Sequence, residues 1–218
     1  MAFMILAYLS KLIEQARSVR ILVRKGAARD AELVARSMME GMATLLWAAQ
    51  EPATRPFQWR GFAYVVDFRL MEKRRASGET IDPEYEKRIR AFLTANSATF
   101  EDPSRTGQPD PYYRTWRQRV SIREIFDSVD GEVLYRDLYG PSSDWTHSGT
   151  ESMGQAIQRA GTTVRWMHND AATAATALAI AFQSLGEATK LAIAHFDAGE
   201  FRTRLDSLRS SFVGRFSP

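Results

Sequence analysis

The segment from Ala31 to Trp47 constrains the fold most, because it is apolar on nearly every face of the helix it would form. A helix of this composition is stable in water only when other parts of the protein surround it. Arg36 and Glu40 nevertheless lie four residues apart in its middle, and a helix brings residues at this spacing to one face. The sequence therefore predicts a central, buried helix that carries a charged pair, which is either a structural ion pair between helices or part of a polar site in the bundle core.

The rest of the chain repeats the helical spacing, with apolar residues at every third or fourth position. Val and Ile seldom alternate with polar residues, so no strand is predicted. We expect an all-α fold, an antiparallel bundle of roughly six to eight helices without a sheet. The predicted helices cover residues 3–25, 28–50, 56–76, 82–98, a segment that starts at Ser121, a segment that starts after Thr150, residues 170–195 and residues 200–212. A short segment, 132–139, follows the one that starts at Ser121.

The length and composition suit one core. A chain of 218 residues with 44% hydrophobic content can bury a sizeable interior, so we expect residues 1–218 to form a single helical domain. Prolines and glycines gather in residues 101–111, which are predicted to be a surface loop within that domain. The C-terminal tail, 200–218, contains an amphipathic helix that either packs on the bundle or joins a second copy in a homo-oligomer.

The residue types exclude several classes of protein. The chain has no cysteine, which rules out disulfides, thiolate metal sites and cysteine nucleophiles. No stretch reaches the roughly 18–20 apolar residues that a membrane-spanning helix needs, and no targeting segment is visible. We therefore expect a cytoplasmic protein without a membrane span, and no motif indicates a cofactor or a metal.

Two stretches combine basic and aromatic residues, namely 55–75 and 112–123. Aromatic stacking together with cations suits single-stranded nucleic acid. The alternative is a set of amphipathic helices with the aromatic side inward and the charged side in water. The net charge of only +3 favours this second interpretation, so nucleic acid is a possible but not a favoured partner.

A second polar constellation follows in residues 135–147, where Tyr135, Tyr139, Ser143 and His147 recur at intervals of four. His147 has polar neighbours and is the best candidate for a general acid or base. The alternative is a helix cap followed by a hydrogen-bonded histidine between helices. In small helical ribonucleases an arginine is separated from the histidine by four to six intervening residues. That arginine is absent here, which counts against that class.

These motifs, taken in order, resemble a known family. Arg36-Ser37-x-x-Glu40 in an apolar helix precedes Trp116 and Arg123, and the Tyr-x-x-x-Tyr-x-x-x-Ser-x-x-x-His pattern that ends at His147 follows. This arrangement is similar to a large bacterial family described only as a domain of unknown function. The resemblance implies an all-helical fold and no particular activity. It also implies that Arg36, Glu40, Tyr139, Ser143 and His147 belong to one constellation.

Three hypotheses about function follow from these patterns. The first is a binding or interaction module, in a bacterial stress or defence locus, with a polar pocket between helices. The second is a hydrolase or nuclease in which His147 is the general acid or base, Arg36 clamps an anion and Glu40 completes the catalytic group. The third is nucleic-acid binding. The candidate binding residues are Tyr135, Tyr139, Ser143, Arg123 and Trp116.

Overall fold

The computed structural model describes residues 1–140, 157–160, 162–166 and 171–213. Helices dominate these residues, which confirms the predicted all-α class. The chain divides into two compact units: unit 1 is Met1–Trp47 with Ile122–Pro218, and unit 2 is Ala48–Ser121. The first boundary between the units falls within the second helix, and the expectation of a single domain stays a prediction.

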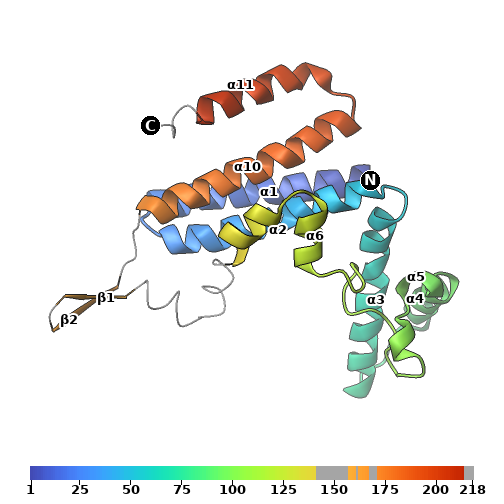
Figure 1. Ribbon diagram of the computed structural model, residues 1–218. Helices are drawn as coiled ribbons and strands as arrows, with labels where there is room; N and C mark the ends of the chain where they lie inside the picture. The colour runs from blue at the N-terminus through green and yellow to red at the C-terminus, as the bar shows by residue number, and fades with distance from the viewer. Residues whose placement is uncertain (141–156, 161, 167–170, 214–218) are drawn as a thin grey trace. The chain divides into compact units, whose positions relative to one another are not determined.

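Unit 1 begins with two long helices, α1 (Ala2–Arg24) and α2 (Ala28–Gln50), close to their predicted limits. Gly26 follows α1 with φ of 76°, a left-handed conformation that glycine adopts without a steric penalty. Gly41 of α2 lies beside Leu12 of α1, whereas Gln15 donates a hydrogen bond of 2.9 Å to Ser37. Later residues of α1 thus meet earlier residues of α2, so the two helices are antiparallel (Figure 1).

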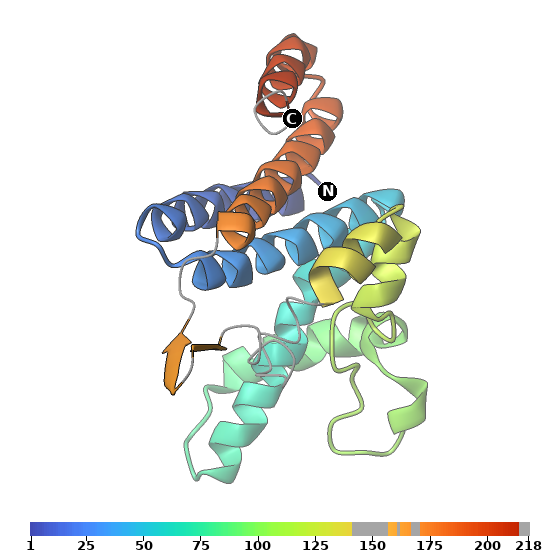
Figure 2. The same cartoon turned by 60° about the vertical axis from the view of Figure 1, so that its left-hand side comes forward.

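The third long helix of unit 1, α10 (Ala171–His195), packs along α1 (Figures 1 and 2). Most of its buried residues are Ala, Ser, Gly or Thr, and such small side chains let two helix backbones come close. The short η3 (Gly199–Phe201) leads into α11 (Arg202–Val213). Phe182 stacks on Phe212 at 3.9 Å between ring centroids, and Arg209 pairs with Glu187 at 2.9 Å, so α11 packs on α10.

A chain of short helical segments completes the described helices of unit 1. They are α6 (Ile122–Ser128), α7 (Glu132–Leu134) and the π-helical turn η2 (Tyr135–Tyr139). The predicted start near Ser121 and the predicted short segment 132–139 agree with these limits. The amide of Gly140 donates to the carbonyl of Tyr135, which is the i to i+5 hydrogen bond that defines a π-helix.

One short hairpin departs from the prediction of a fold without a sheet. Strands β1 (Ile157–Ala160) and β2 (Thr163–Trp166) are antiparallel, with Ile157 opposite Trp166 and Ala160 opposite Thr163. A helix was predicted to begin after Thr150, but residues 157–160 and 163–166 are strands. The sequence contains a signal for a hairpin here, since the dipeptide Gly161-Thr162 is of the Gly-X type that favours two-residue turns and β-branched residues follow it in the sequence.

Unit 2 is built from α3 (Arg55–Ala76), α4 (Pro83–Ala95), α5 (Ser97–Phe100) and the 3₁₀ turn η1 (Pro103–Arg105). The predicted start of the fourth helix is confirmed, because the Asp82 side chain accepts a 3.0 Å hydrogen bond from the Glu84 amide and Pro83 occupies the first turn. That predicted helix is divided at Asn96 into α4 and α5. The buried core of the unit comprises Val65, Phe68, Met71, Ile89, Leu93, Phe100 and Tyr112.

Candidate functional site

The charged pair of α2 meets the π-helical turn η2 within unit 1. A guanidinium nitrogen of Arg36 donates to the Tyr139 hydroxyl at 2.9 Å. That hydroxyl in turn donates to Oε2 of Glu40 at 3.1 Å. Arg36, Tyr139 and Glu40, which we call the polar cluster, therefore form a chain of hydrogen bonds between residues about a hundred positions apart in the sequence.

Tyr139 is the central member of the polar cluster and only 6% of its surface is exposed. The Arg36 guanidinium lies over its ring at 4.4 Å from the centroid, which adds a cation–π attraction. Burial raises the pKa of the Tyr139 hydroxyl above its ordinary value, and the nearby Glu40 carboxylate raises it further. The hydroxyl therefore keeps its proton at neutral pH, and can donate to Glu40 while it accepts from Arg36.

Aromatic packing fixes the position of Tyr139. Its ring stacks on Tyr135 with centroids 5.3 Å apart and planes inclined by 21°, and both rings contact Phe126 of α6. Residues four apart on a helical turn are neighbours on one face, which brings the rings of Tyr135 and Tyr139 together. Phe126 is fully buried, so the hydroxyl of Tyr139 is aimed at α2 by a rigid group of rings.

A cavity of about 210 Å³ lies between α2, the α7–η2 segment and α10. Some of the residues that line it are sequence neighbours of the polar cluster. Met39 and Leu138, each adjacent to a member of the cluster, line it together with Met42 and Ile180. Ser184 and Gln183 of α10 supply polar groups. The cavity is therefore mainly apolar, and the charged groups belong to the neighbouring faces of the same two elements.

Comparison with known protein families shows which family the chain belongs to. The sequence profile of a family of unknown function (DUF5677) matches residues 2–162. The chain belongs to this family. The resemblance to a domain of unknown function is thus confirmed, whereas the spacing of its individual motifs stays untested. No curated protein and no solved structure matches the chain.

The family match covers only part of the candidate site. It includes all three members of the polar cluster and the aromatic residues that support Tyr139, but it ends before α10, which supplies one wall of the cavity. All three residues of the polar cluster therefore lie within the matched region. The cavity as a whole needs a helix that lies outside that region.

The structure brings together some of the predicted site residues. Tyr139 is hydrogen-bonded to both Arg36 and Glu40, and Tyr135 stacks on Tyr139. Ser143 and His147 lie outside the described residues, so the grouping of all five stays a prediction. Arg123 is exposed on α6, whereas Trp116 belongs to unit 2.

Sequence reasoning did not identify Phe126, Met39, Met42 or Ser184 as parts of this region. The two methionines had a signal, because they are three residues apart on the apolar helix and methionine adapts readily to the shape of a ligand. Ser184 had no such signal, since a single serine in an Ala-rich helix is typical of close helix packing.

The polar cluster is suited to stabilising the fold or contacting a ligand, and its tyrosine hydroxyl is not suited to nucleophilic attack. A raised pKa keeps the Tyr139 hydroxyl protonated near neutral pH, and the protonated hydroxyl is a poor nucleophile. The described residues also hold no group of three or more His, Asp or Glu that fits a metal ion. The catalytic hypothesis therefore depends on His147, and it stays a prediction.

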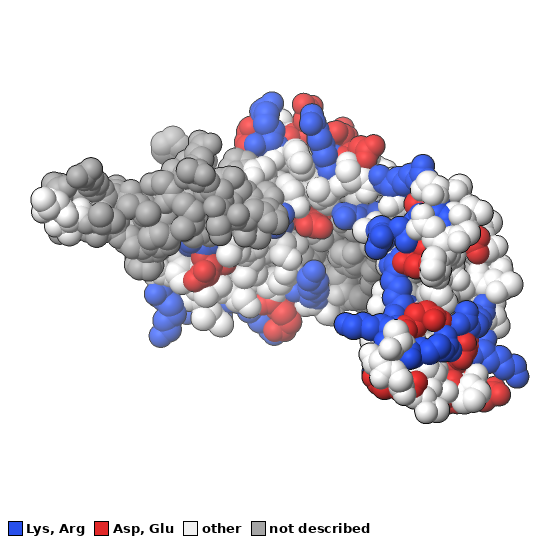
Figure 3. Space-filling model, turned by 90° about the horizontal axis from the view of Figure 1, so that it is seen from below, with Lys and Arg blue, Asp and Glu red and all other residues white. Residues whose placement is uncertain are grey.

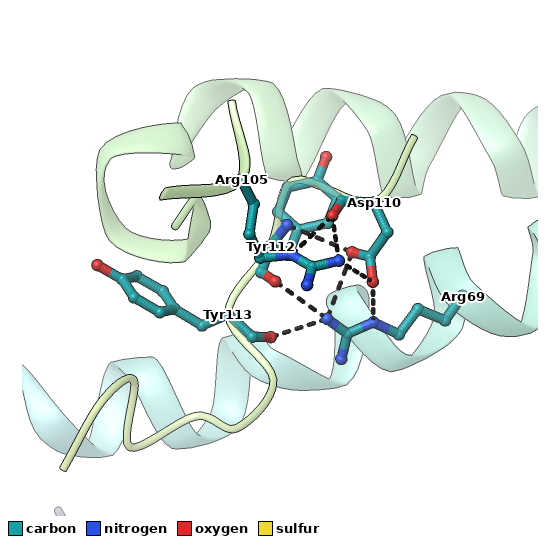
Figure 4. Close-up of polar contacts among 5 residues, drawn as sticks. All are labelled: Arg69, Arg105, Asp110, Tyr112 and Tyr113. Atoms are coloured by element: carbon teal, nitrogen blue, oxygen red, sulfur yellow. Dashed lines mark hydrogen bonds and ion pairs between the residues drawn. The ribbon is translucent and has the colours of Figure 1, made fainter. Parts of the chain in front are cut away.

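The basic stretch 55–75 uses several of its charges inside unit 2. Arg69 donates to the Asp110 carboxylate at 3.0 and 3.3 Å and to the backbone carbonyls of Tyr112 and Tyr113 at 3.2 and 2.8 Å. Arg105 also donates to the Asp110 carbonyl, at 2.8 Å (Figure 4). The predicted surface loop 101–111 is thus attached to α3 through an arginine that sequence reasoning had considered for nucleic acid.

Arg75 of the same stretch, and Arg90 of α4, are also paired with carboxylates. Arg75 contacts Glu72 and Glu86 at 2.6 Å each, and Arg90 contacts the same two carboxylates. The aromatic residues Phe62, Tyr64 and Phe68 contribute to the core of unit 2. Figure 3 shows basic and acidic side chains interspersed on the face it presents. This pattern favours the amphipathic-helix interpretation over a binding surface for nucleic acid.

Among the described residues, no helix is long and apolar enough to cross a membrane.

Proposed function

We propose that the chain is a binding module, and that its binding site lies in unit 1 where α2, the α7–η2 segment and α10 surround the cavity. The observation that carries this proposal is the juxtaposition of a cavity of about 210 Å³ with a buried tyrosine that joins two charged residues. Mainly apolar cavities with a few convergent polar groups are the usual form of small-molecule sites.

The polar cluster positions one wall of this site. Leu138 lines the cavity and directly precedes Tyr139, whose hydroxyl is bonded to both charged residues of α2. Loss of these hydrogen bonds would free η2 to move relative to α2 and would change the shape of the cavity. Arg36, Glu40 and Tyr139 are therefore positioning residues in this proposal.

A panel of neutral, anionic and cationic fragments tests the proposal. A ligand that binds the folded state raises its thermal stability, so hits are found by thermal shift and verified by ligand-observed NMR. Ala179 is exposed and lines the cavity, so Ala179→Phe fills the space without overpacking the core. Ala194 is also exposed on α10 but does not line the cavity, so Ala194→Phe is the matched control.

We expect some fragments to bind the wild-type protein and Ala194→Phe, and the same fragments to lose their binding to Ala179→Phe. The proposal is wrong if no fragment binds, or if every fragment that binds does so equally well to both variants. Circular dichroism on both variants establishes that the comparison is made between folded proteins.

A further inference from the structure

The chemistry of the cavity lining specifies the charge of its occupant. None of its described lining residues is Lys, Arg, Asp or Glu, and four of them are Met39, Met42, Leu138 and Ile180. A charged group moved from water into such surroundings would lose its hydration and find no counter-ion. The part of a ligand that enters the cavity is therefore uncharged.

The volume limits the size of the occupant. An apolar cavity of about 150 Å³ holds one benzene molecule, and this cavity measures about 210 Å³. The space accommodates a benzene-sized ring with a small substituent, and it is too small for a nucleotide or a peptide side chain with its backbone.

One buried polar residue gives the occupant an orientation. Ser184 is 1% exposed and lines the cavity, so its hydroxyl is a polar group that a molecule in the cavity meets at the α10 wall. A hydroxyl in a mainly apolar wall favours a ligand that exchanges a hydrogen bond with it over a ligand that covers it with an apolar group. Gln183, the other polar residue of this wall beside Thr176, is exposed and keeps its access to water.

We propose that the cavity between α2, α7–η2 and α10 binds a compact, uncharged molecule that combines a benzene-sized apolar body with one hydrogen-bonding group placed against Ser184. Phenol is the simplest molecule of this kind. The proposal rests on the proposed binding function and adds to it the chemical class of the ligand.

Titration calorimetry and ligand-observed NMR with three probes test this class on the full chain. Phenol has the ring and the hydrogen-bonding group, toluene has the ring alone, and benzoate has the ring with a charge. We expect phenol to bind at one site per chain, toluene to bind more weakly, and benzoate to bind at least about tenfold more weakly than phenol because its carboxylate must lose its hydration. Benzoate that binds as tightly as phenol would overturn the proposal.

Two variants and one control variant test whether the probes bind in the cavity. Ser184→Ala removes the hydroxyl at nearly constant volume, so it should weaken phenol about three- to tenfold, the contribution of one hydrogen bond, and leave toluene unchanged. Ala179→Phe should abolish the binding of both, while Ala194→Phe should retain it. Equal phenol affinity in wild type and Ser184→Ala would contradict the role of Ser184.

The outcomes separate this inference from the proposed function. If a charged fragment binds and Ala179→Phe blocks it while phenol does not bind, the binding function stands and the ligand class is wrong. If neither the three probes nor any fragment of the broader panel binds, both are wrong.

Discussion

At the scale of single residues, Tyr139 is the group whose removal is most informative. Tyr139→Phe keeps the ring but loses the hydrogen bonds to Arg36 and Glu40, and bonds to charged groups contribute more than neutral ones. We expect the free energy of unfolding to fall by about 1–3 kcal/mol, measured by urea denaturation.

Tyr135→Phe is the matched control for this change. Its ring stacks on Tyr139, but its hydroxyl has no hydrogen bond to the described residues. The control should change the free energy of unfolding by about 0.5 kcal/mol or less. Equal losses in the two variants would show that the hydrogen bonds of the polar cluster contribute nothing specific.

The raised pKa of Tyr139 predicts a dependence of stability on alkaline pH. The hydroxyl ionises near 10.0 in the unfolded chain and at a higher pH in the fold, so above 10.0 the unfolded state releases this proton first. Its contribution to stability is therefore complete below that pH and is lost as the pH rises through the folded pKa. Urea denaturation above pH 10.0 should show a steeper loss of stability in the wild type than in Tyr139→Phe.

The comparison between the two proteins isolates Tyr139. The pKa of Tyr112 is also raised, mainly by burial, but that tyrosine contributes equally to both. Parallel curves for wild type and variant would mean that the pKa of Tyr139 is not raised by folding.

At the scale of secondary structure elements, two glycines in helices predict opposite effects of the same substitution. A Cβ atom at Gly61 of α3 would lie 2.5 Å from Phe100 Cζ and 3.1 Å from Phe92 Cζ, so Gly61→Ala should destabilise by about 1–3 kcal/mol through overpacking. Gly186 of α10 has no described atom within 4 Å of such a Cβ. Gly186→Ala should therefore stabilise by about 0.5–1 kcal/mol through helix propensity.

Urea denaturation of both variants checks this pair. A gain of stability in Gly61→Ala would show that α3 does not approach the rings of Phe92 and Phe100 as closely as described.

The sequence was informative about elements wherever the determining interaction is local. Asp82-Pro83 starts α4 because the cap acts on an amide two residues away, and the spacing of Arg36 and Glu40 places them on one helix face. The spacing alone could not predict the partner of this pair, because Tyr139 reaches it through tertiary packing against Phe126. Only the family resemblance had grouped Tyr139 with Arg36 and Glu40. The hairpin at 157–166 was missed because its signal, Gly161-Thr162 and two β-branched residues, is short beside the helical periodicity of the rest.

At the scale of the whole molecule, the distribution of charge predicts weak interaction with nucleic acid. The net charge is +3, and Arg69 and Arg75, two arginines of the most basic stretch, are paired with carboxylates in unit 2. We expect no salt-dependent retention of the chain on immobilised single-stranded oligonucleotides. Retention that weakens steeply as salt is raised would mean that phosphates displace these carboxylates, and would support the third hypothesis.

The division into two units also determines which part of the chain the proposed function requires. The polar cluster and the cavity both lie in unit 1, so the proposed function needs no particular arrangement of unit 2. Nothing in the sequence indicated this division, because apolar periodicity is similar in both units. The position of the first boundary inside α2 has no sequence signal either, since the helix has no Gly or Pro there.

The most direct test of the ligand site is an NMR titration of the protein labelled with ¹³C at its methionine methyl groups. Met39 and Met42 line the cavity, whereas Met71 is buried in the core of unit 2 and serves as an internal control. Phenol should shift the signals of Met39 and Met42, assigned by Met→Leu substitution, and leave Met71 in place. Unchanged signals of Met39 and Met42 at saturating phenol would contradict a binding site in this cavity.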